Sequence, residues 1–247
     1  MTNKILVIFG SKSDENVYGE ITSALQEKKI DFQLEICSAH RNPERLSEIL
    51  KDDYKVIIAG AGLAAHLPGV IASKTISPVI GVPCDGTLNG LDAFLSIIQM
   101  PPRIPVLAVG VNNSQKAARF AGLLLKNYEG VNIINHEKKN KAEDILKKLN
   151  VEYEVSDNFR ENKININFVD IKKGKVKDKD FLTINVPVID ESKAKDALKL
   201  LKKAKKGLWV GINMAENAAI AAVEILNLEG KYYDILNGYR EELKANK

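Results

Sequence analysis

Residues 4–36 read KILVIFGSKSDENVYGEITSALQEKKIDFQLEI, and the hydrophobic pattern changes twice within this stretch. The apolar run that ends at Gly10 is typical of a buried strand, and residues 16–29 place apolar side chains at helical spacing. Residues 31–36 return to a strand pattern. A strand, a helix and a second strand in this order predict a parallel pair of strands joined by a crossover helix.

The same alternation continues to about residue 128. Further strands are predicted at 55–62, 78–83 and 105–111, and further helices at 43–53, 66–75, 90–100 and 114–128. The strands are continuously apolar, which indicates that helices cover both faces of the sheet. The predicted fold class is therefore α/β, with a doubly wound parallel sheet in a three-layer sandwich.

The second half of the chain repeats this plan in weaker form. VGVNNSQKAARFAGLLL at 109–125 is echoed by VGINMAENAAIAAVEIL at 210–226. Ten of the sixteen glycines lie in residues 1–126, and glycines allow a ligand to approach the backbone closely. We therefore predict a tandem duplication, with a catalytic domain at residues 1–128 and a degenerate, non-catalytic and structural copy at residues 129–247.

Composition argues against several classes of protein. A net charge of +4 is mild, and no arginine-rich arm is present, so nucleic-acid binding is not expected. Apolar stretches stay well short of the roughly 18 residues that a membrane span needs, and the N-terminus shows no signal-peptide pattern. Cys37 and Cys84 are isolated thiols without metal-ligand spacing. A cytoplasmic location is expected, because isolated thiols suit a reducing compartment.

Ligands of doubly wound folds bind beyond the carboxyl ends of the strands, so the loops there are the candidates for function. GSKSD at 10–14 joins the first strand to the first helix, whose N-terminus attracts an anion. Ser11 and Ser13 would add hydroxyl donors, and Asp14 could accept hydrogen bonds from sugar hydroxyls. The alternative is that Ser13 or Asp14 only caps the helix.

SAHR at 38–41 follows the second strand. Ser38 and Arg41 suit a phosphate, arginine through forked, charge-assisted hydrogen bonds. His40 belongs to the residue type that titrates near neutrality and can move a proton at pH 7. The alternative is a helix-capping loop that carries a surface histidine.

GAGLAAHLPG at 60–69 follows the third strand. Gly60, Gly62 and the alanines would leave room for a flat ligand, and His66 would lie near the start of the next helix. Simple tight turning is the alternative. Three such loops on consecutive strands predict one pocket with a phosphate end and a histidine end.

Other reactive side chains are expected to be structural. Cys84 is interpreted as a buried thiol rather than a nucleophile, because no base is spaced to support it. His136 is expected to be exposed to solvent. The lysine runs at 138–148 and 199–206 are expected to form solvated helix faces.

Taken together, the motifs resemble the PurE family of purine biosynthesis over about residues 4–126. The matching segments, in the family's order, are GSKSD, SAHRNPERL, AGAGLAAHLPGVIASKT and LDAFLSIIQMPPRIPV. The resemblance implies a flavodoxin-like fold. AAHLPG followed by KT resembles the class that rearranges N5-carboxyaminoimidazole ribonucleotide, whereas the other class carboxylates aminoimidazole ribonucleotide directly with CO2. Two departures are Arg103, where the family usually has glycine, and the loop at 84–90, where it usually has a serine-bearing loop.

The resemblance also implies roles for individual residues. His40 would be the general acid/base, and His66 would orient the carboxylate or CO2. No metal or organic cofactor is implied. The implied contacts to the substrate are Ser11, Ser13, Ser38 and Arg41 at the 5′-phosphate, Asp14 at the ribose, and the backbone of Gly60, Ala61, Gly62, Leu63 and Ala64 at the imidazole.

Family members are octamers, so the resemblance implies a homo-oligomer. We expect a tetramer of tandem chains with helices at 217–227 and 231–244 at its contacts, although burial within one chain would explain their apolar positions equally well. A companion ATP-dependent carboxylase is an expected partner. Two further readings are a related carboxylase acting on a nicotinate nucleotide, and a non-catalytic ribotide-binding or scaffold protein.

Overall fold

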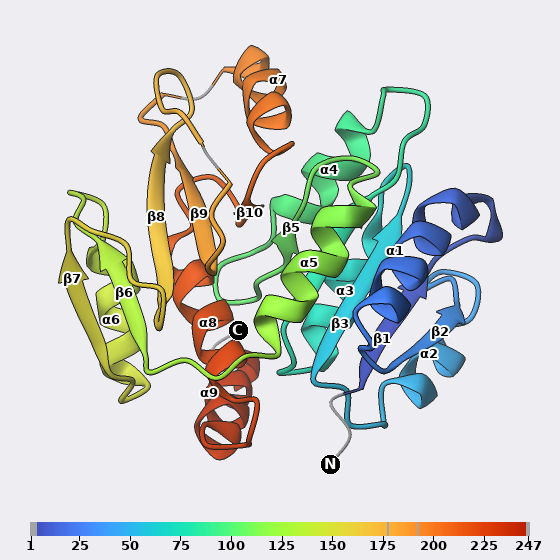
Figure 1. The fold of residues 1–247 in the computed structure, drawn as a ribbon, viewed down its shortest axis with the longest axis horizontal. Helices are drawn as coiled ribbons and strands as arrows, with labels where there is room; N and C mark the ends of the chain where they lie inside the picture. Colours follow the sequence, from blue (N-terminus) through green and yellow to red (C-terminus); the bar gives the residue numbers. More distant parts are fainter. Residues whose placement is uncertain (1–3, 177, 192, 246–247) are drawn as a thin grey trace.

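The computed structural model describes residues 4–176, 178–191 and 193–245, and it contains two α/β halves that share one sheet (Figure 1). The sheet has ten strands in the order β2-β1-β3-β4-β5-β10-β9-β8-β6-β7. Strands β1 to β5 form one half of the sheet and strands β6 to β10 form the other. The two halves meet where β5 and β10 lie side by side.

The first half has the strand order 2-1-3-4-5, which is the order of flavodoxin-like folds, and its strands are parallel. The prediction of a doubly wound α/β fold is therefore confirmed. Its strands are β1 (Ile5–Phe9), β2 (Phe32–Ile36), β3 (Val56–Ala61), β4 (Val79–Pro83) and β5 (Leu107–Ala108). Its helices are the 3-10 turn η1 (Lys12–Asp14), α1 (Glu15–Glu27), α2 (Pro43–Ile49), α3 (His66–Lys74), α4 (Leu91–Ile98) and α5 (Ser114–Leu124).

The second half repeats this strand order as β7-β6-β8-β9-β10. Its strands are β6 (Val131–Ile134), β7 (Tyr153–Ser156), β8 (Ile164–Asp170), β9 (Thr183–Val188) and β10 (Leu208–Trp209). Its helices are α6 (Asn140–Lys148), α7 (Ala194–Lys203), α8 (Ala215–Leu226) and α9 (Tyr233–Ala245). In the part of the chain that the structure describes, no helix joins β7 to β8 or β8 to β9, where the first half has α2 and α3.

A buried pair of asparagines, Asn132 and Asn165, lies in the second half where those helices are missing from the described residues. The Asn132 side chain donates to the Asn158 carbonyl and to the Asn165 side chain, both at 2.9 Å. The Asn165 amide donates to the Arg160 carbonyl at 2.7 Å. The loop after β7 is therefore bonded directly to the sheet, which satisfies polar groups that would be costly to bury unpaired.

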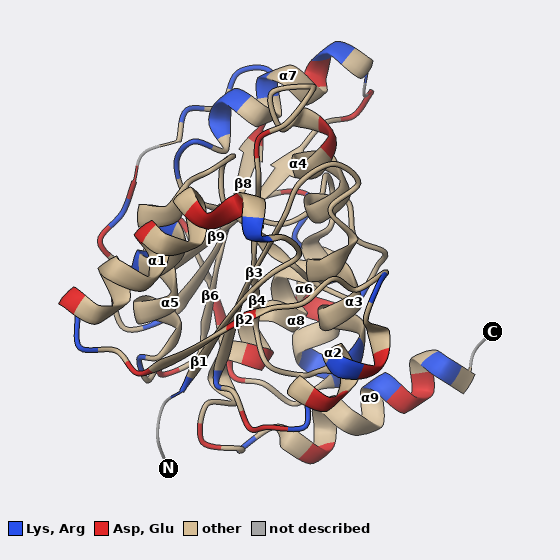
Figure 2. Cartoon of the chain, turned by 90° about the vertical axis from the view of Figure 1, so that its right-hand side faces the viewer, with Lys and Arg blue, Asp and Glu red and all other residues tan. Residues whose placement is uncertain are grey.

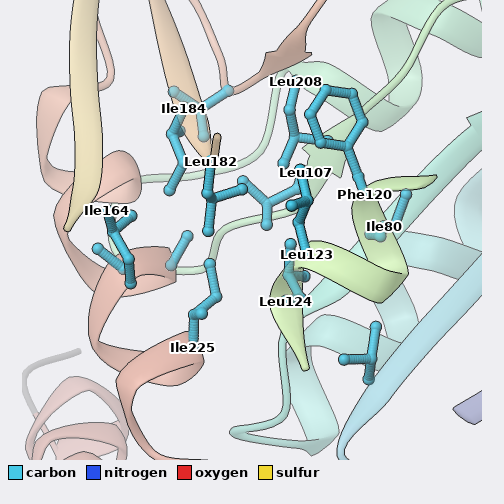
Figure 3. Packing of buried hydrophobic residues seen from close by; sticks show 14 of the residues in the cluster. Ile80, Leu107, Phe120, Leu123, Leu124, Ile164, Leu182, Ile184, Leu208 and Ile225 are labelled. Carbon is cyan, nitrogen blue, oxygen red and sulfur yellow. The ribbon is translucent and has the colours of Figure 1, made fainter. Parts of the chain in front are cut away.

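The two halves are joined by an antiparallel pairing of β5 with β10, in which Trp209 stands opposite Ala108. Both strands are two residues long, although the sequence pattern predicts a longer strand at 105–111. Such short strands carry no readable periodicity, which is why the sequence could not predict this junction. The core runs across it: Figure 3 shows Leu107 and Leu123 of the first half close to Leu208 of the second.

Two hydrophobic clusters lie on the two faces of the sheet. One includes buried residues of α1, α5, α6 and α8, and the other includes buried residues of α2, α3, α4 and α7. Basic residues gather along α7 (Figure 2), and Lys199, Lys202 and Lys205 are exposed, as predicted for that lysine run. No helix in the described residues is long and apolar enough to cross a membrane.

One turn recurs at the same place in both halves. Asn112, after β5, has φ +50° and donates its backbone N–H to the Pro83 carbonyl at 2.8 Å. Asn213, after β10, has φ +57° and donates to the Pro187 carbonyl, also at 2.8 Å. Asparagine is among the residues that best tolerate this left-handed backbone, so the sequence echo noted above carries a conserved turn geometry with it.

Candidate active site

The loop after β1 presents two serines and an aspartate. The Ser11 hydroxyl accepts hydrogen bonds from the Ser13 backbone N–H at 3.2 Å and from the Ser13 hydroxyl at 2.8 Å. Ser11 is therefore the residue that caps η1, and Asp14 precedes α1 without a capping hydrogen bond from its side chain. Asp14 occupies the N-cap position of α1, as the alternative expected, but its side chain forms no capping hydrogen bond. The Asp14 carboxylate is therefore not engaged in capping the helix.

Asp14 connects this loop to the end of β4. Burial raises the pKa of the Asp14 carboxyl, and hydrogen bonds from the Ser13 hydroxyl and the Cys84 thiol partly offset that rise. Cys84 is 2% exposed, and burial raises the pKa of its thiol, with the negative charge of Asp14 adding to the shift. A thiol with a raised pKa stays protonated and is a poor nucleophile, so the structure agrees with a structural Cys84.

The loop after β2 carries Ser38, His40 and Arg41. The Ser38 hydroxyl accepts from the Arg41 backbone N–H at 3.4 Å, and the Ser38 carbonyl accepts from the Asn42 N–H at 2.9 Å. These bonds form the turn that leads into α2, whose first residue is Pro43. The Arg41 side chain is exposed, and its guanidinium forms no salt bridge within the described ranges. It can therefore turn toward an anion without breaking an ion pair.

His40 and His66 are brought into contact from two different loops. His66 is the first residue of α3, and its Nδ1 lies 2.8 Å from Nε2 of His40. The two rings meet edge to face, with centroids 4.9 Å apart and an interplanar angle of 79°. One ring must donate and the other accept, so a single proton is shared at this contact. Both side chains are exposed, which leaves the pair open to a substrate.

The loop after β3 combines a packing role with an open surface. A Cβ on Gly60 would lie 2.0 Å from the Phe9 ring, so the absence of a side chain there makes room for the core rather than for a ligand. Gly62 passes close to the Cys84 carbonyl. Leu63 and Ala65 have φ of +54° and +36°, and the Leu63 side chain is 65% exposed. The loop surface open to a ligand is therefore formed by residues 62–64.

The three loops start side by side, because their strands are neighbours in the sheet. The Gly10 N–H donates to the Gly60 carbonyl at 3.1 Å, and the Cys37 N–H donates to the Phe9 carbonyl at 2.9 Å. Contacts between side chains of different loops are recorded for His40 with His66 and for Asp14 with Cys84. In the described part of the chain, Arg41 makes no hydrogen bond with Ser11 or Ser13.

Two contacts that hold the 84–90 loop and the turn at Arg103 were not predicted from the sequence. The Asn112 side chain accepts from the Asp85 N–H at 2.9 Å and holds the start of the 84–90 loop. Arg103 donates its backbone N–H to the Asn217 side chain of α8, which also donates to the Pro101 carbonyl at 3.0 Å. Arg103 has φ +73°, a backbone conformation that favours glycine, and this explains why a glycine would suit the position.

The prediction that His136 is exposed to solvent is wrong. Its ring stacks on Phe168 with centroids 4.9 Å apart and an interplanar angle of 12°, and the residue is half-buried. Its Nδ1 accepts from the Lys138 N–H at 3.1 Å. His136 follows β6, whereas Phe168 lies on β8, the second strand after it in the chain. The sequence pattern near His136 therefore gave no sign of this partner.

Comparison with known proteins gives one family match. A family model described as AIR carboxylase matches residues 4–144, which extends past residue 128 into the second half. An N5-carboxyaminoimidazole ribonucleotide mutase of Methanocaldococcus jannaschii is 50% identical over 118 residues, covering 47% of this chain and 75% of that protein. The mutase of Haemophilus influenzae is 46% identical over 135 residues, covering 52% of this chain and 82% of that protein.

Two further similarities differ in kind from the first two. A phosphoribosylaminoimidazole carboxylase of Candida glabrata is 44% identical over 149 residues, which are 58% of this chain and 26% of that protein. The crystal structure of Treponema denticola PurE matches 48% of this chain and 77% of that chain at 27% identity, with a TM-score of 0.44. The assignment of the fold rests on the strand order of the first half and not on this structural match.

Proposed function

The chain belongs to the AIR carboxylase family, and on that premise we propose that it rearranges N5-carboxyaminoimidazole ribonucleotide to 4-carboxyaminoimidazole ribonucleotide in purine biosynthesis. The observation that carries the proposal is the contact between His40 and His66. This contact brings His40, a group that can transfer a proton, together with the loops after β2 and β3, whose other residues suit a ribotide. The mutase is preferred because similar proteins from M. jannaschii and H. influenzae carry that name.

The proposed binding mode divides the substrate among the three loops. Ser11, Ser13, Ser38 and Arg41 would bind the 5′-phosphate, which suits hydroxyl donors and an unpaired guanidinium. Asp14, whose side chain forms no capping hydrogen bond, would accept from the ribose hydroxyls. The backbone from Gly60 to Ala64 would face the imidazole, with residues 62–64 offering the open surface.

In the proposed reaction His40 first donates a proton and later takes one up. Protonated His40 gives its proton to the carbamate nitrogen as the bond from that nitrogen to the carboxyl carbon breaks, releasing CO2 beside aminoimidazole ribonucleotide. The electron pair at C4 of the imidazole then attacks the CO2 carbon and forms the new carbon–carbon bond. Neutral His40 takes the C4 proton, which restores aromaticity and returns the histidine to its starting state.

His66 would act as a positioning and polarising group in this scheme. Its Nδ1 lies within hydrogen-bonding distance of His40 Nε2, so it can set which nitrogen of His40 carries the proton. It would also orient the carboxylate or the trapped CO2 while the carboxyl group passes from the carbamate nitrogen to C4 of the imidazole. Trapping matters because CO2 that escapes turns the rearrangement into a simple decarboxylation.

We expect rapid conversion of N5-carboxyaminoimidazole ribonucleotide by the purified chain and slow conversion of aminoimidazole ribonucleotide supplied with bicarbonate. The test follows formation of the 4-carboxy product with each substrate at matched concentration, with the His40→Asn variant as the blank. Fast turnover of the second mixture alone would refute the mutase assignment. It would support direct carboxylation, the alternative favoured by the similarity to the C. glabrata carboxylase.

We also propose that the two halves arose by tandem duplication and that residues 129–247 form a degenerate, non-catalytic copy. The repeated strand order and the recurring asparagine turn support the duplication. The lack of a second SAHR motif and of a glycine-rich counterpart to residues 60–62 supports the loss of chemistry. The second half would then have a structural role. Its Asn217 side chain, for example, accepts a hydrogen bond from the Arg103 backbone of the first half.

A tetramer of these tandem chains is the proposed assembly, with α9 at its contacts. The other helix expected there, α8, is buried within the chain from Ala215 to Ile225, so burial within one chain explains its apolar positions. Tyr233 and Ile235 on α9 are 56% and 40% exposed, which is unusual for large apolar side chains. Light scattering at micromolar concentration is expected to give four times the mass of 27.3 kDa. A stable mass of one chain would disprove the assembly. A cytoplasmic location is proposed from the two free, buried cysteines, and a companion ATP-dependent carboxylase would supply the substrate.

A further inference from the structure

A cavity of about 270 Å³ lies apart from the candidate active site and shares no lining residue with it. One wall is Phe120 of α5, in the first half, and the rest comes from the second half. The remaining lining residues are Phe159, Asn167, Lys175, Val176, Lys179, Phe181, Thr183, Asn185 and Gly207. Three phenyl rings, two lysines and three uncharged polar side chains therefore face one space.

The aromatic and cationic groups of this cavity lie next to each other. The rings of Phe159 and Phe181 are tilted by 44° with centroids 5.7 Å apart. Lys179 Nζ lies 4.6 Å from the Phe159 centroid and 5.8 Å from the Phe181 centroid. Aromatic faces offer a planar ring a surface to stack on, while the ammonium group offers an anion a charged partner.

Thr183 gives an independent sign that a ligand belongs here. The residue is 7% exposed, and its hydroxyl has no hydrogen-bond partner among the residues that the structure describes. A buried hydroxyl without a partner carries a desolvation cost of about 1–3 kcal/mol. The neighbouring amides are differently placed: Asn167 donates to Asn185 at 2.9 Å, and Asn185 donates to the Leu208 carbonyl at 3.1 Å. The threonine hydroxyl is thus left to bind something else.

The lysine-bearing wall of the cavity is fixed by both halves of the chain. Lys116 of α5 pairs with Asp178 at 2.7 Å, and Asp178 also accepts from the Gly207 N–H at 3.2 Å. Arg119 of α5 donates to the Lys179 carbonyl and lies 3.5 Å from Asp180. The two aspartates in this wall, Asp178 and Asp180, are therefore paired with cations of α5. The positive charges of Lys175 and Lys179 remain for an anionic ligand.

From these observations we propose that the cavity binds a small planar anion, an aromatic or heteroaromatic ring that carries one carboxylate or phosphate group. The ring packs against Phe159 and Phe181. The anionic group pairs with Lys179 and Lys175 and accepts a hydrogen bond from the Thr183 hydroxyl. The volume suits a molecule of one or two fused rings. This site is independent of the proposed reaction, because none of its residues belongs to the three loops of the first half.

The first test measures binding of 2-naphthoate by titration calorimetry, beside its neutral isostere 2-naphthamide. We expect naphthoate to bind with a Kd below about 1 mM and naphthamide to bind about tenfold or more weakly, because charge-assisted hydrogen bonds are the stronger ones. The same titration with the His40→Asn variant is expected to give an unchanged Kd. Loss of binding in that variant would overturn the proposal by placing naphthoate in the ribotide site.

Two variants locate the ligand. Lys179→Met is expected to weaken naphthoate about tenfold, and the matched control Lys195→Met, on the exposed side of α7, leaves the Kd unchanged. Thr183→Val keeps the shape of the side chain, so it is expected to weaken naphthoate severalfold without lowering the melting temperature. Equal affinity for naphthoate and naphthamide, or an unchanged Kd in both Lys179→Met and Thr183→Val, would overturn the proposal. Should Lys179→Met not fold, Lys175→Met replaces it.

Discussion

Replacing His40 with asparagine is expected to lower turnover of N5-carboxyaminoimidazole ribonucleotide by about two to four orders of magnitude, the usual contribution of a positioned acid/base group. Asparagine keeps a polar side chain of similar reach but cannot take up or release a proton near pH 7. His40 is exposed and its side chain contacts His66, so its loss removes little packing. Binding of the ribotide should largely survive, because the proposed phosphate contacts come from other residues.

The other two histidines of the chain provide a comparison and a matched control for this measurement. His66→Asn removes the ring that contacts His40, so we expect a smaller loss of turnover and a changed pH profile. His136→Asn alters a histidine stacked on Phe168 in the second half and should leave turnover at the level of the unmodified protein. Turnover is followed by product formation, and ribotide affinity by calorimetry.

Unchanged turnover in His40→Asn would contradict the assignment of His40, whereas ribotide binding without turnover in the unmodified chain would favour a ribotide-binding or scaffold protein. Equal losses in His40→Asn and His136→Asn would point to a general effect on folding instead of chemistry. Simultaneous loss of turnover and of ribotide binding in His40→Asn would show that the histidine holds the substrate rather than moving its proton. The three results are distinguishable because each gives a different combination of turnover and ribotide affinity in the two variants.

The sequence could predict the parts of this molecule that depend on local pattern. The strand β1 and the helix α1 follow from their hydrophobic periods, and α2 begins at Pro43 because proline suits a first helical turn. The approach of His40 to His66 was also open to prediction, since both follow the parallel strands β2 and β3, which flank β1 in the sheet. Which ring nitrogens meet was not, because that depends on side-chain rotamers.

The sequence could not predict features that depend on distant partners. Gly60 was interpreted as space for a ligand, yet its missing side chain accommodates Phe9, fifty-one positions earlier. The β5–β10 junction rests on two strands of two residues each, too short for any period to appear. The cavity beside Thr183 brings together Phe120 and Phe181, which belong to different halves of the chain. In each case the decisive contact joins residues that no local window contains.

Replacing Arg240 with methionine is expected to destabilise the chain by about 3–5 kcal/mol above about pH 8, where the Glu224 carboxyl is ionised, the usual cost of removing one partner of a buried ion pair. Arg240 Nη2 lies 2.8 Å from Glu224 Oε1, and the side chains of the two residues are only 10% and 3% exposed. This pair joins α9 to α8, and Arg240 also donates to the Thr75 carbonyl of the first half at 3.5 Å. Methionine fills similar space but leaves the Glu224 carboxylate buried without a counter-charge.

The pH dependence of this loss follows from the protonation of Glu224. Burial raises the pKa of its carboxyl above the ordinary value of 4.5, and Arg240 opposes that rise, so removing Arg240 raises the pKa further. With Arg240 in place the pKa of the Glu224 carboxyl is about 8, so below that pH the carboxyl is protonated in the folded unmodified chain and in the folded variant alike, and the deficit should be small. Above about pH 8 the unmodified chain ionises Glu224 beside Arg240, while the folded variant must keep the proton or carry an unpaired charge. The deficit therefore grows as the pH rises through 8.

Urea denaturation of the unmodified chain and of Arg240→Met at several pH values measures this deficit directly. The double variant Glu224→Leu with Arg240→Met is expected to recover most of the lost stability, because apolar groups can replace a buried ion pair at little cost. Lys244→Met is the matched control on the same helix. It breaks an exposed pair with Glu241, whose side chains are 67% and 70% exposed, and should cost less than about 1 kcal/mol. A double variant no more stable than Arg240→Met would show that Arg240 acts through its contact with Thr75 instead, because removing the carboxylate could not then repair the loss.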